Sequence, residues 1–198
     1  KAYVLYPIST FFDGAATTYH HELGHQWINF LRGTVLEPGL PHWPLSDLAS
    51  GVMGYSGSTG QGLRFPYEMT PEGDDFRLHY VNEQPEFNDL ELYLMGLVPA
   101  ESVGSHFVFD DQNQSPAGEG LLHGPVTHIT IEDIIAVMGP RSPDFNSSQK
   151  TFRIATILVS EQLLSVEAMS FFDFFARRAE LREQVPFTNG FAKGNAKP

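Results

Sequence analysis

The hexapeptide HHELGH, residues 20–25, constrains this chain more than any other stretch of its sequence. The residues around it predict a helix over about 17–32, which Gly33 ends. On such a helix His21 and His25 are four residues apart, so their imidazoles project from one face with Cβ atoms about 5 to 6 Å apart. Two neutral imidazoles in this position can hold one Zn²⁺, which is the physical content of the HExxH pattern.

The residues beside the two histidines have different expected roles. Glu22 directly follows the first ligand and is placed to take a proton from water at the metal, so it is the expected general base. His20 points about 100° away around the helix and is expected to be an outer-shell or surface residue. The competing interpretation is a chance pair of histidines on an ordinary helix that binds no metal.

Composition narrows the kinds of site and partner. Cysteine is absent from the 198 residues, which excludes disulfides, thiolate ligands and a cysteine nucleophile, so a metal must be held by His, Asp or Glu. A formal net charge of −12 argues against nucleic acid and anionic membranes as partners. A hydrophobic content of 41% fits one packed domain over residues 1–198, and no apolar run is long enough to span a membrane. The first ten residues lack the features of a signal peptide.

A catalytic zinc site needs a third protein ligand and an open position for water. Leu31 stands where a metzincin would have its third ligand, so that class is excluded. A gluzincin-like site would take a carboxylate from a later helix, and Glu91 in FNDLELYLMGL is the preferred candidate. However, Asn88 followed by Glu91 also fits a capping box, and the residues alone leave both interpretations open. Asp89 is expected to complement the helix dipole.

His42, in PHWPL, is the main competitor to Glu91. It could be a metal ligand or a hydrogen-bond donor to the transition state, and a buried structural histidine beside Trp43 is an equal alternative. Tyr93 and Tyr55 are further candidates for the donor that stabilises the oxyanion.

The periodicity and turn signals predict an α+β fold with long loops rich in glycine and proline. Residues 34–73 are expected to be loop-like, and the phenylalanines of the last helix are expected to pack in the core. The expected strands are 3–6, 75–81, 106–110 and 151–160, and the expected later helices are 88–95, 131–138 and 165–183.

DDQNQS, residues 110–115, has alternating oxygen ligands that could hold a second metal, Ca²⁺. Pro116 stands where an EF-hand needs glycine, and no glutamate occupies the twelfth position. An ordinary turn is therefore favoured over a calcium loop.

Several motifs occur in a fixed order: HELGHQW, HW, FNDLELYLMGLVPAESV, then ITIEDIIAVMGPRSP and TFRIATILV. Together they resemble a group of large secreted bacterial proteins that are predicted zinc peptidases. These carry HExGHxW, an HWS-like step, (D/E)LYLMGL(I/V)PPEEV and DIIxxxGPRxP, so the resemblance covers roughly residues 18–160. It places an acidic residue immediately before LYLMGL, which favours Glu91 as third ligand. PHWPL and VPAES depart from the group's usual GHWS and PPEE.

The resemblance implies a zincin metallopeptidase that hydrolyses peptide bonds, with a peptide or protein substrate and a secreted or extracellular location. The implied fold is zincin-like, with an active-site helix, a small mixed or antiparallel sheet and a C-terminal helix. Only about 16 residues precede the active-site helix, so the chain is either a reduced domain or the C-terminal part of a larger zincin domain. The alternative function is a catalytically inactive zincin-like binding module in a larger extracellular protein.

Overall fold

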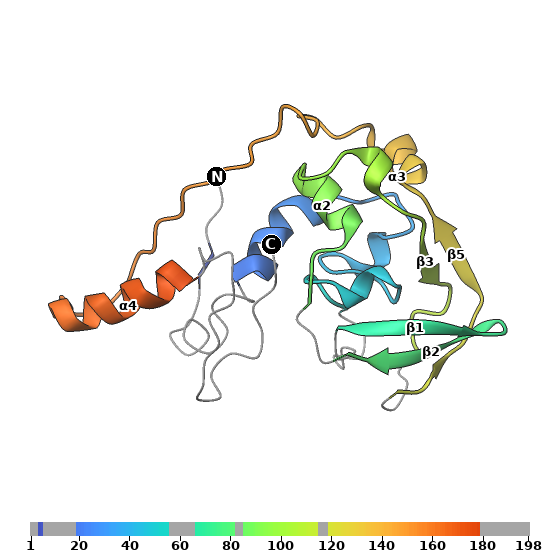
Figure 1. Ribbon diagram of the computed structural model, residues 1–198, viewed down its shortest axis with the longest axis horizontal. Helices are drawn as coiled ribbons and strands as arrows, with labels where there is room; N and C mark the ends of the chain where they lie inside the picture. The colour runs from blue at the N-terminus through green and yellow to red at the C-terminus, as the bar shows by residue number, and fades with distance from the viewer. Residues whose placement is uncertain (1–3, 6–18, 56–65, 82–84, 115–118, 179–198) are drawn as a thin grey trace.

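The computed structural model describes residues 4–5, 19–55, 66–81, 85–114 and 119–178 (Figure 1). These residues form an α+β structure of short helices and small antiparallel sheets. No helix among them combines the length and the apolar character of a membrane span. The described part of the first helix, called the HELGH helix below, covers residues 19–28. The following elements are η1 (Glu37–Gly39), η2 (Leu48–Ser50), β1 (Tyr67–Glu72), β2 (Asp75–Tyr80), α2 (Asp89–Met95), η3 (Ala100–Ser102), β3 (His106–Phe109), β4 (Leu121–Leu122), β5 (Val126–Ile129), α3 (Ile131–Met138) and α4 (Val166–Arg178).

The strands form two separate sheets. One has the order β1-β2-β4 and the other pairs β3 with β5, and every pairing is antiparallel. The β1–β2 hairpin runs crosswise to the β3–β5 pair (Figure 1). Its tight turn contains Gly73 with φ of +67°, a conformation that glycine adopts without steric cost. The expected strands at 75–81 and 106–110 are thereby confirmed as β2 and β3.

The long loop between the HELGH helix and β1 contributes to the core through its described residues 29–55. Its side chains Leu36, Trp43, Leu45 and Leu48 are at most 1% exposed. Buried backbone groups need hydrogen-bond partners, and this loop finds one in β3, beside which it lies. The backbone N–H of Phe109 in β3 donates to the carbonyl oxygen of Leu45 over 3.0 Å. For the described residues 34–55, the loop-like expectation for 34–73 was right about the largely irregular backbone, which is interrupted only by η1 and η2, but the expectation missed β1.

Helix α2 begins and ends where its local signals place it. The Asn88 side chain accepts a hydrogen bond from the backbone N–H of Glu91, and the Glu91 side chain accepts one from the N–H of Asn88. Gly96 follows the helix in the left-handed conformation with φ of +76°. Helix α3 likewise follows Thr130, whose backbone N–H donates to Asp133. Both expected helices are confirmed.

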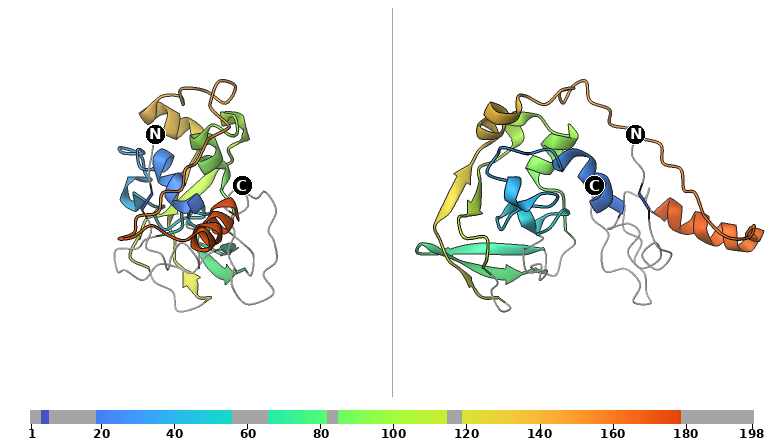
Figure 2. Two further views of the ribbon diagram at one scale, coloured as in Figure 1. Left: turned by 90° about the vertical axis from the view of Figure 1, so that its left-hand side faces the viewer. Right: turned by 180° about the vertical axis from the view of Figure 1, so that it is seen from behind.

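The end of the described chain departs most from expectation. Residues 151–160 belong to no strand, and α4 lies apart from the other described elements at the end of an extended segment (Figures 1 and 2). Phe171 and Phe174 are 51% and 52% exposed, so the prediction that this aromatic stripe packs in the core was wrong for these two residues. Residues 4–5 show no strand, and the rest of the expected strand at 3–6 lies outside the described residues.

Candidate metal centre

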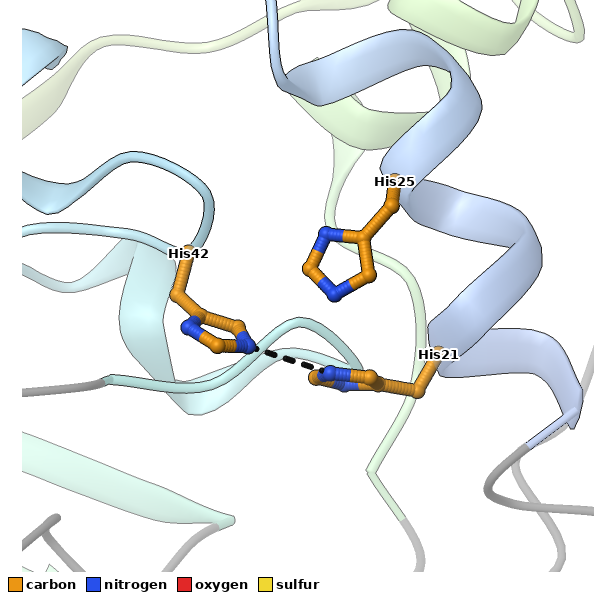
Figure 3. A group of neighbouring side chains, drawn as sticks. All are labelled: His21, His25 and His42. Atoms are coloured by element: carbon orange, nitrogen blue, oxygen red, sulfur yellow. Dashed lines mark hydrogen bonds between the residues drawn. The ribbon is translucent and has the colours of Figure 1, made fainter. Parts of the chain in front are cut away.

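Three histidines from two parts of the chain meet beside the HELGH helix. His21 and His25 come from the helix, and His42 comes from the turn that follows η1 (Figure 3). The ring centroids lie 4.9, 5.0 and 5.1 Å apart, so the three rings surround a common point. One nitrogen from each ring lies within 4.8 Å of the other two. Among the described residues this is the one group of three or more histidines or carboxylates with such spacing.

Two glycines bring the helix and the turn together. A Cβ at Gly24 would lie 2.3 Å from the Met53 sulfur, so the bare backbone lets the helix approach the 52–54 segment. A Cβ at Gly39 would lie 1.9 Å from the Pro44 nitrogen, which shows how tightly the chain folds back around His42. The two histidines four residues apart on the helix thus face a third ligand group from a sharply turned loop.

The outer ring nitrogens of the helix histidines have fixed partners. His21 Nδ1 lies 2.9 Å from Val52 O, and His25 Nδ1 lies 3.1 Å from Asn29 Oδ1. Because a carbonyl oxygen only accepts, each Nδ1 carries the proton and donates it, which leaves the Nε2 lone pair free. Such a second contact orients a metal-binding histidine and selects its tautomer.

The Nε2 atoms of His21 and His42 lie 3.1 Å apart. Two imidazole nitrogens bound tetrahedrally to one zinc at about 2.0 to 2.1 Å would be about 3.3 Å apart. Without a metal, the same approach requires His42 to donate an Nε2–H to His21. His42 Nδ1 is buried and has no hydrogen-bond partner among the described residues, and His42 Nε2 is the ring nitrogen that contacts His21.

Burial and neighbouring charge keep His42 uncharged. Burial lowers the pKa of His42 first, and repulsion between a charged His42 ring and its neighbours His21 and His25 lowers it further, to about 4. A neutral imidazole is the form that binds a metal, so the His42 ring needs no net loss of a proton at neutral pH. Binding through Nε2 requires only that its one N–H stand on Nδ1. The donor set of three imidazoles suits zinc, with a fourth position available for water or substrate.

Glu91, the ligand expected from the sequence, lies outside this group of three histidines. Its side chain is 1% exposed, and its carboxylate accepts hydrogen bonds from Trp43 Nε1 over 2.7 Å, Met53 N over 3.3 Å and Asn88 N over 2.9 Å. Burial raises its pKa to about 7, against the opposing effect of these hydrogen bonds. Of the two interpretations that the sequence left open for Glu91, the structure shows the capping box with Asn88 at the start of α2.

The other candidates have separate positions. Glu22 is half-buried, and its carboxylate forms no hydrogen bond or ion pair within the described part of the chain. Asp89 begins α2 and bonds to His106 and Gly104 N, so it contributes no ligand to the cluster. The Tyr93 hydroxyl accepts from the backbone N–H of Arg141, and the Tyr55 hydroxyl donates to a backbone carbonyl over 3.0 Å. Both hydroxyls thus make structural contacts.

Residues 110–114, the described part of the suggested calcium loop, form a turn. Asp110 Oδ1 accepts from the Thr127 hydroxyl over 2.7 Å, and Asp111 Oδ1 accepts from Asn113 N over 2.9 Å. Gln112 points inward and bonds to the backbone of the core loop. Pro116 lies outside the described residues.

No family model matches the chain, and comparisons with curated proteins and with solved structures found no match. The assignment of the site therefore depends on its own geometry. The sequence signal for His42 was the HW step after the HExxH motif, which named a competitor ligand without ranking it above Glu91.

Proposed function

We propose that this chain is a zinc-dependent metallopeptidase whose metal is held by His21, His25 and His42. The observation that carries the proposal is the convergence of three imidazoles, two of them with Nδ1 atoms that are already hydrogen-bonded to acceptors. When bound there, zinc supplies a Lewis acid that polarises a carbonyl and lowers the pKa of water toward about 7. The site is zincin-like in its helix and differs from the gluzincin pattern in its third ligand.

The chain's own groups have distinct roles in this proposal. Glu22 follows His21 on the helix and has no competing ion pair among the described residues, so it can accept a proton and return it to the leaving amine nitrogen. Val52 O and Asn29 Oδ1 hold the helix imidazoles in the tautomer that presents Nε2.

The substrate class is supported by the motif order. HELGHQW, HW and the LYLMGL and GPRSP segments resemble bacterial secreted zinc peptidases, which favours a peptide or protein substrate in an extracellular setting. The acidic composition, with a net charge of −12, is unsuited to nucleic acid substrates.

The first experiment measures zinc per chain by metal mass spectrometry, together with hydrolysis of fluorescein-labelled casein. The native chain is expected to carry about one zinc and to cleave the casein. H42A is expected to lose both properties, and H128A, which removes an exposed histidine on β5, is the matched control that keeps both.

The catalytic step is tested with E22Q, which keeps the side chain's size and removes its basicity. This variant should retain its zinc and lose activity by about 100-fold or more. Zinc binding without hydrolysis by the native chain would favour the alternative, a zincin-like binding module. A native chain that takes up no zinc would refute the metal site itself.

A further inference from the structure

Glu91 is the one charged residue in the described part of the chain that is classed as buried. A helix cap does not require this burial, because Asp133 serves the equivalent role at α3 while exposed. Removing a carboxylate from water is costly unless its oxygens are well paired. A buried cap at α2 therefore indicates a second role for this carboxylate.

The second role is visible in the partners of Oε1. This oxygen accepts from the indole N–H of Trp43 over 2.7 Å and from the backbone N–H of Met53 over 3.3 Å. Trp43 directly follows His42, and Met53 directly follows Val52, whose carbonyl accepts from His21 Nδ1. Glu91 Oε1 thus connects the turn that carries His42 with the segment whose carbonyl orients His21.

Both segments are irregular and depend on such contacts for their position. His42 lies in a turn after η1, and Val52 and Met53 lie in a turn after η2. The two segments also meet directly, since Trp43 N–H donates to Gly54 O over 3.1 Å. The backbone at Gly51 packs against the same carboxylate, because a Cβ there would lie 3.1 Å from Glu91 Oε2.

We propose that Glu91 is a positioning residue of the metal centre, which holds His42 and His21 in place through Trp43 and the Val52–Met53 segment without binding the metal. This inference rests on the proposed zinc site. The hydrogen bonds that hold a ligand side chain in its binding orientation contribute to metal affinity. A ligand that loses this support therefore binds its metal more weakly.

The test compares zinc affinity in the native chain, E91Q and H42A by competition with a chromophoric chelator. Glutamine preserves the shape of the side chain, but its amide nitrogen cannot accept from the N–H groups that surround the carboxylate. E91Q is expected to bind one zinc per chain with an affinity about 10- to 100-fold lower than the native chain. H42A, which lacks a ligand, should lose more.

D133A is the matched control, because it removes the equivalent capping contact at α3, away from the three histidines. It should leave zinc affinity unchanged, although it removes a capping carboxylate from the third position of its helix, as E91Q does. W43F, which removes the indole N–H and leaves Glu91 intact, should reproduce part of the affinity loss of E91Q. A role in capping alone would leave the zinc affinity of both E91Q and W43F at the native value.

A second readout does not need the metal. In the zinc-free protein, nitrogen NMR of the His21 ring should show the Nδ1–H tautomer in the native chain and a mixture of tautomers in E91Q. Native zinc affinity and an unchanged His21 tautomer in E91Q would overturn the positioning role. Loss of stoichiometric zinc in E91Q with retention in H42A would make Glu91 a ligand and overturn it as well. A native chain without zinc would refute the proposed function, and the His21 tautomer would still decide the role of Glu91.

Discussion

His106 Nε2 lies 2.7 Å from Asp89 Oδ1, and this contact joins β3 to the first residue of α2. The other ring nitrogen lies 2.9 Å from Asp47 Oδ2, beside η2. Both carboxylates are acceptors, so the ring satisfies both only as the charged imidazolium. Three elements of the core are therefore joined by one protonated histidine.

The first prediction concerns the pH dependence of this contact. Burial disfavours the charged form of His106, but the hydrogen bonds and charges of Asp47 and Asp89 outweigh burial and raise its pKa. A histidine with a raised folded-state pKa contributes stability that is complete below its unfolded value of about 6.5 and is lost as pH rises through the folded value. H106Q should thus lower the free energy of unfolding by about 1 to 3 kcal/mol at pH 6, and by less at pH 9.

Urea unfolding of zinc-free protein at the two pH values measures this difference. The control is H123Q, which removes a more exposed ion pair with Asp75 and should change stability by less than about 1 kcal/mol at either pH. An H106Q effect that is equal at pH 6 and pH 9 would contradict the charged-histidine explanation.

The second prediction concerns Glu91, whose pKa is raised by burial to about 7. A carboxyl group with a raised folded-state pKa binds its proton more tightly in the folded state, so zinc-free protein gains stability as pH falls from about 7 toward the ordinary value near 4.5. The gain from this group is at most about 3 kcal/mol.

Comparison of native chain and E91Q isolates that contribution. With EDTA present, the unfolding free energy of the native chain minus that of E91Q should be larger at pH 5 than at pH 8. A difference that stays constant over this range would show that Glu91 does not titrate there.

The third prediction concerns the backbone at Gly39. A Cβ at this position would lie 1.9 Å from the Pro44 nitrogen, and backbone atoms cannot move aside as a flexible side chain can. G39A should therefore cost about 2 to 4 kcal/mol of stability and weaken zinc binding, because His42 lies between the two residues that would clash.

Thermal unfolding and chelator competition test both effects. G73A is the control: its φ of +67° makes alanine unfavourable by about 1 kcal/mol, but no atom lies within 4 Å of the added Cβ. It should leave zinc affinity unchanged. Native stability and zinc affinity in G39A would show that the turn around His42 adapts.

Helices α2 and α3 could be predicted because their signals are local. Asn88 and Glu91, three residues apart, satisfy each other's backbone groups, and Gly96 supplies the left-handed residue at the end. Nothing outside this short stretch is needed for these contacts. The same holds for the four-residue spacing of His21 and His25.

Strands were predicted less well, because a strand exists only where it finds a partner. β1 contains Pro71, which weakens any strand signal, yet it pairs with β2 at the edge of its sheet in the described structure. TFRIATILVS, residues 151–160, has strong strand propensity, but no described strand pairs with it.

The sequence by itself determined that His21 and His25 share one face of a helix beside Glu22, because helical spacing depends only on neighbouring residues. Only the tertiary structure shows that His42, and not Glu91, lies beside these two histidines. His42 reaches the helix through the sharp turn at Gly39, whereas Glu91 turns toward Trp43 and Met53 in the core. Both positions depend on contacts between segments far apart in the chain, and these follow from the packing of the whole core.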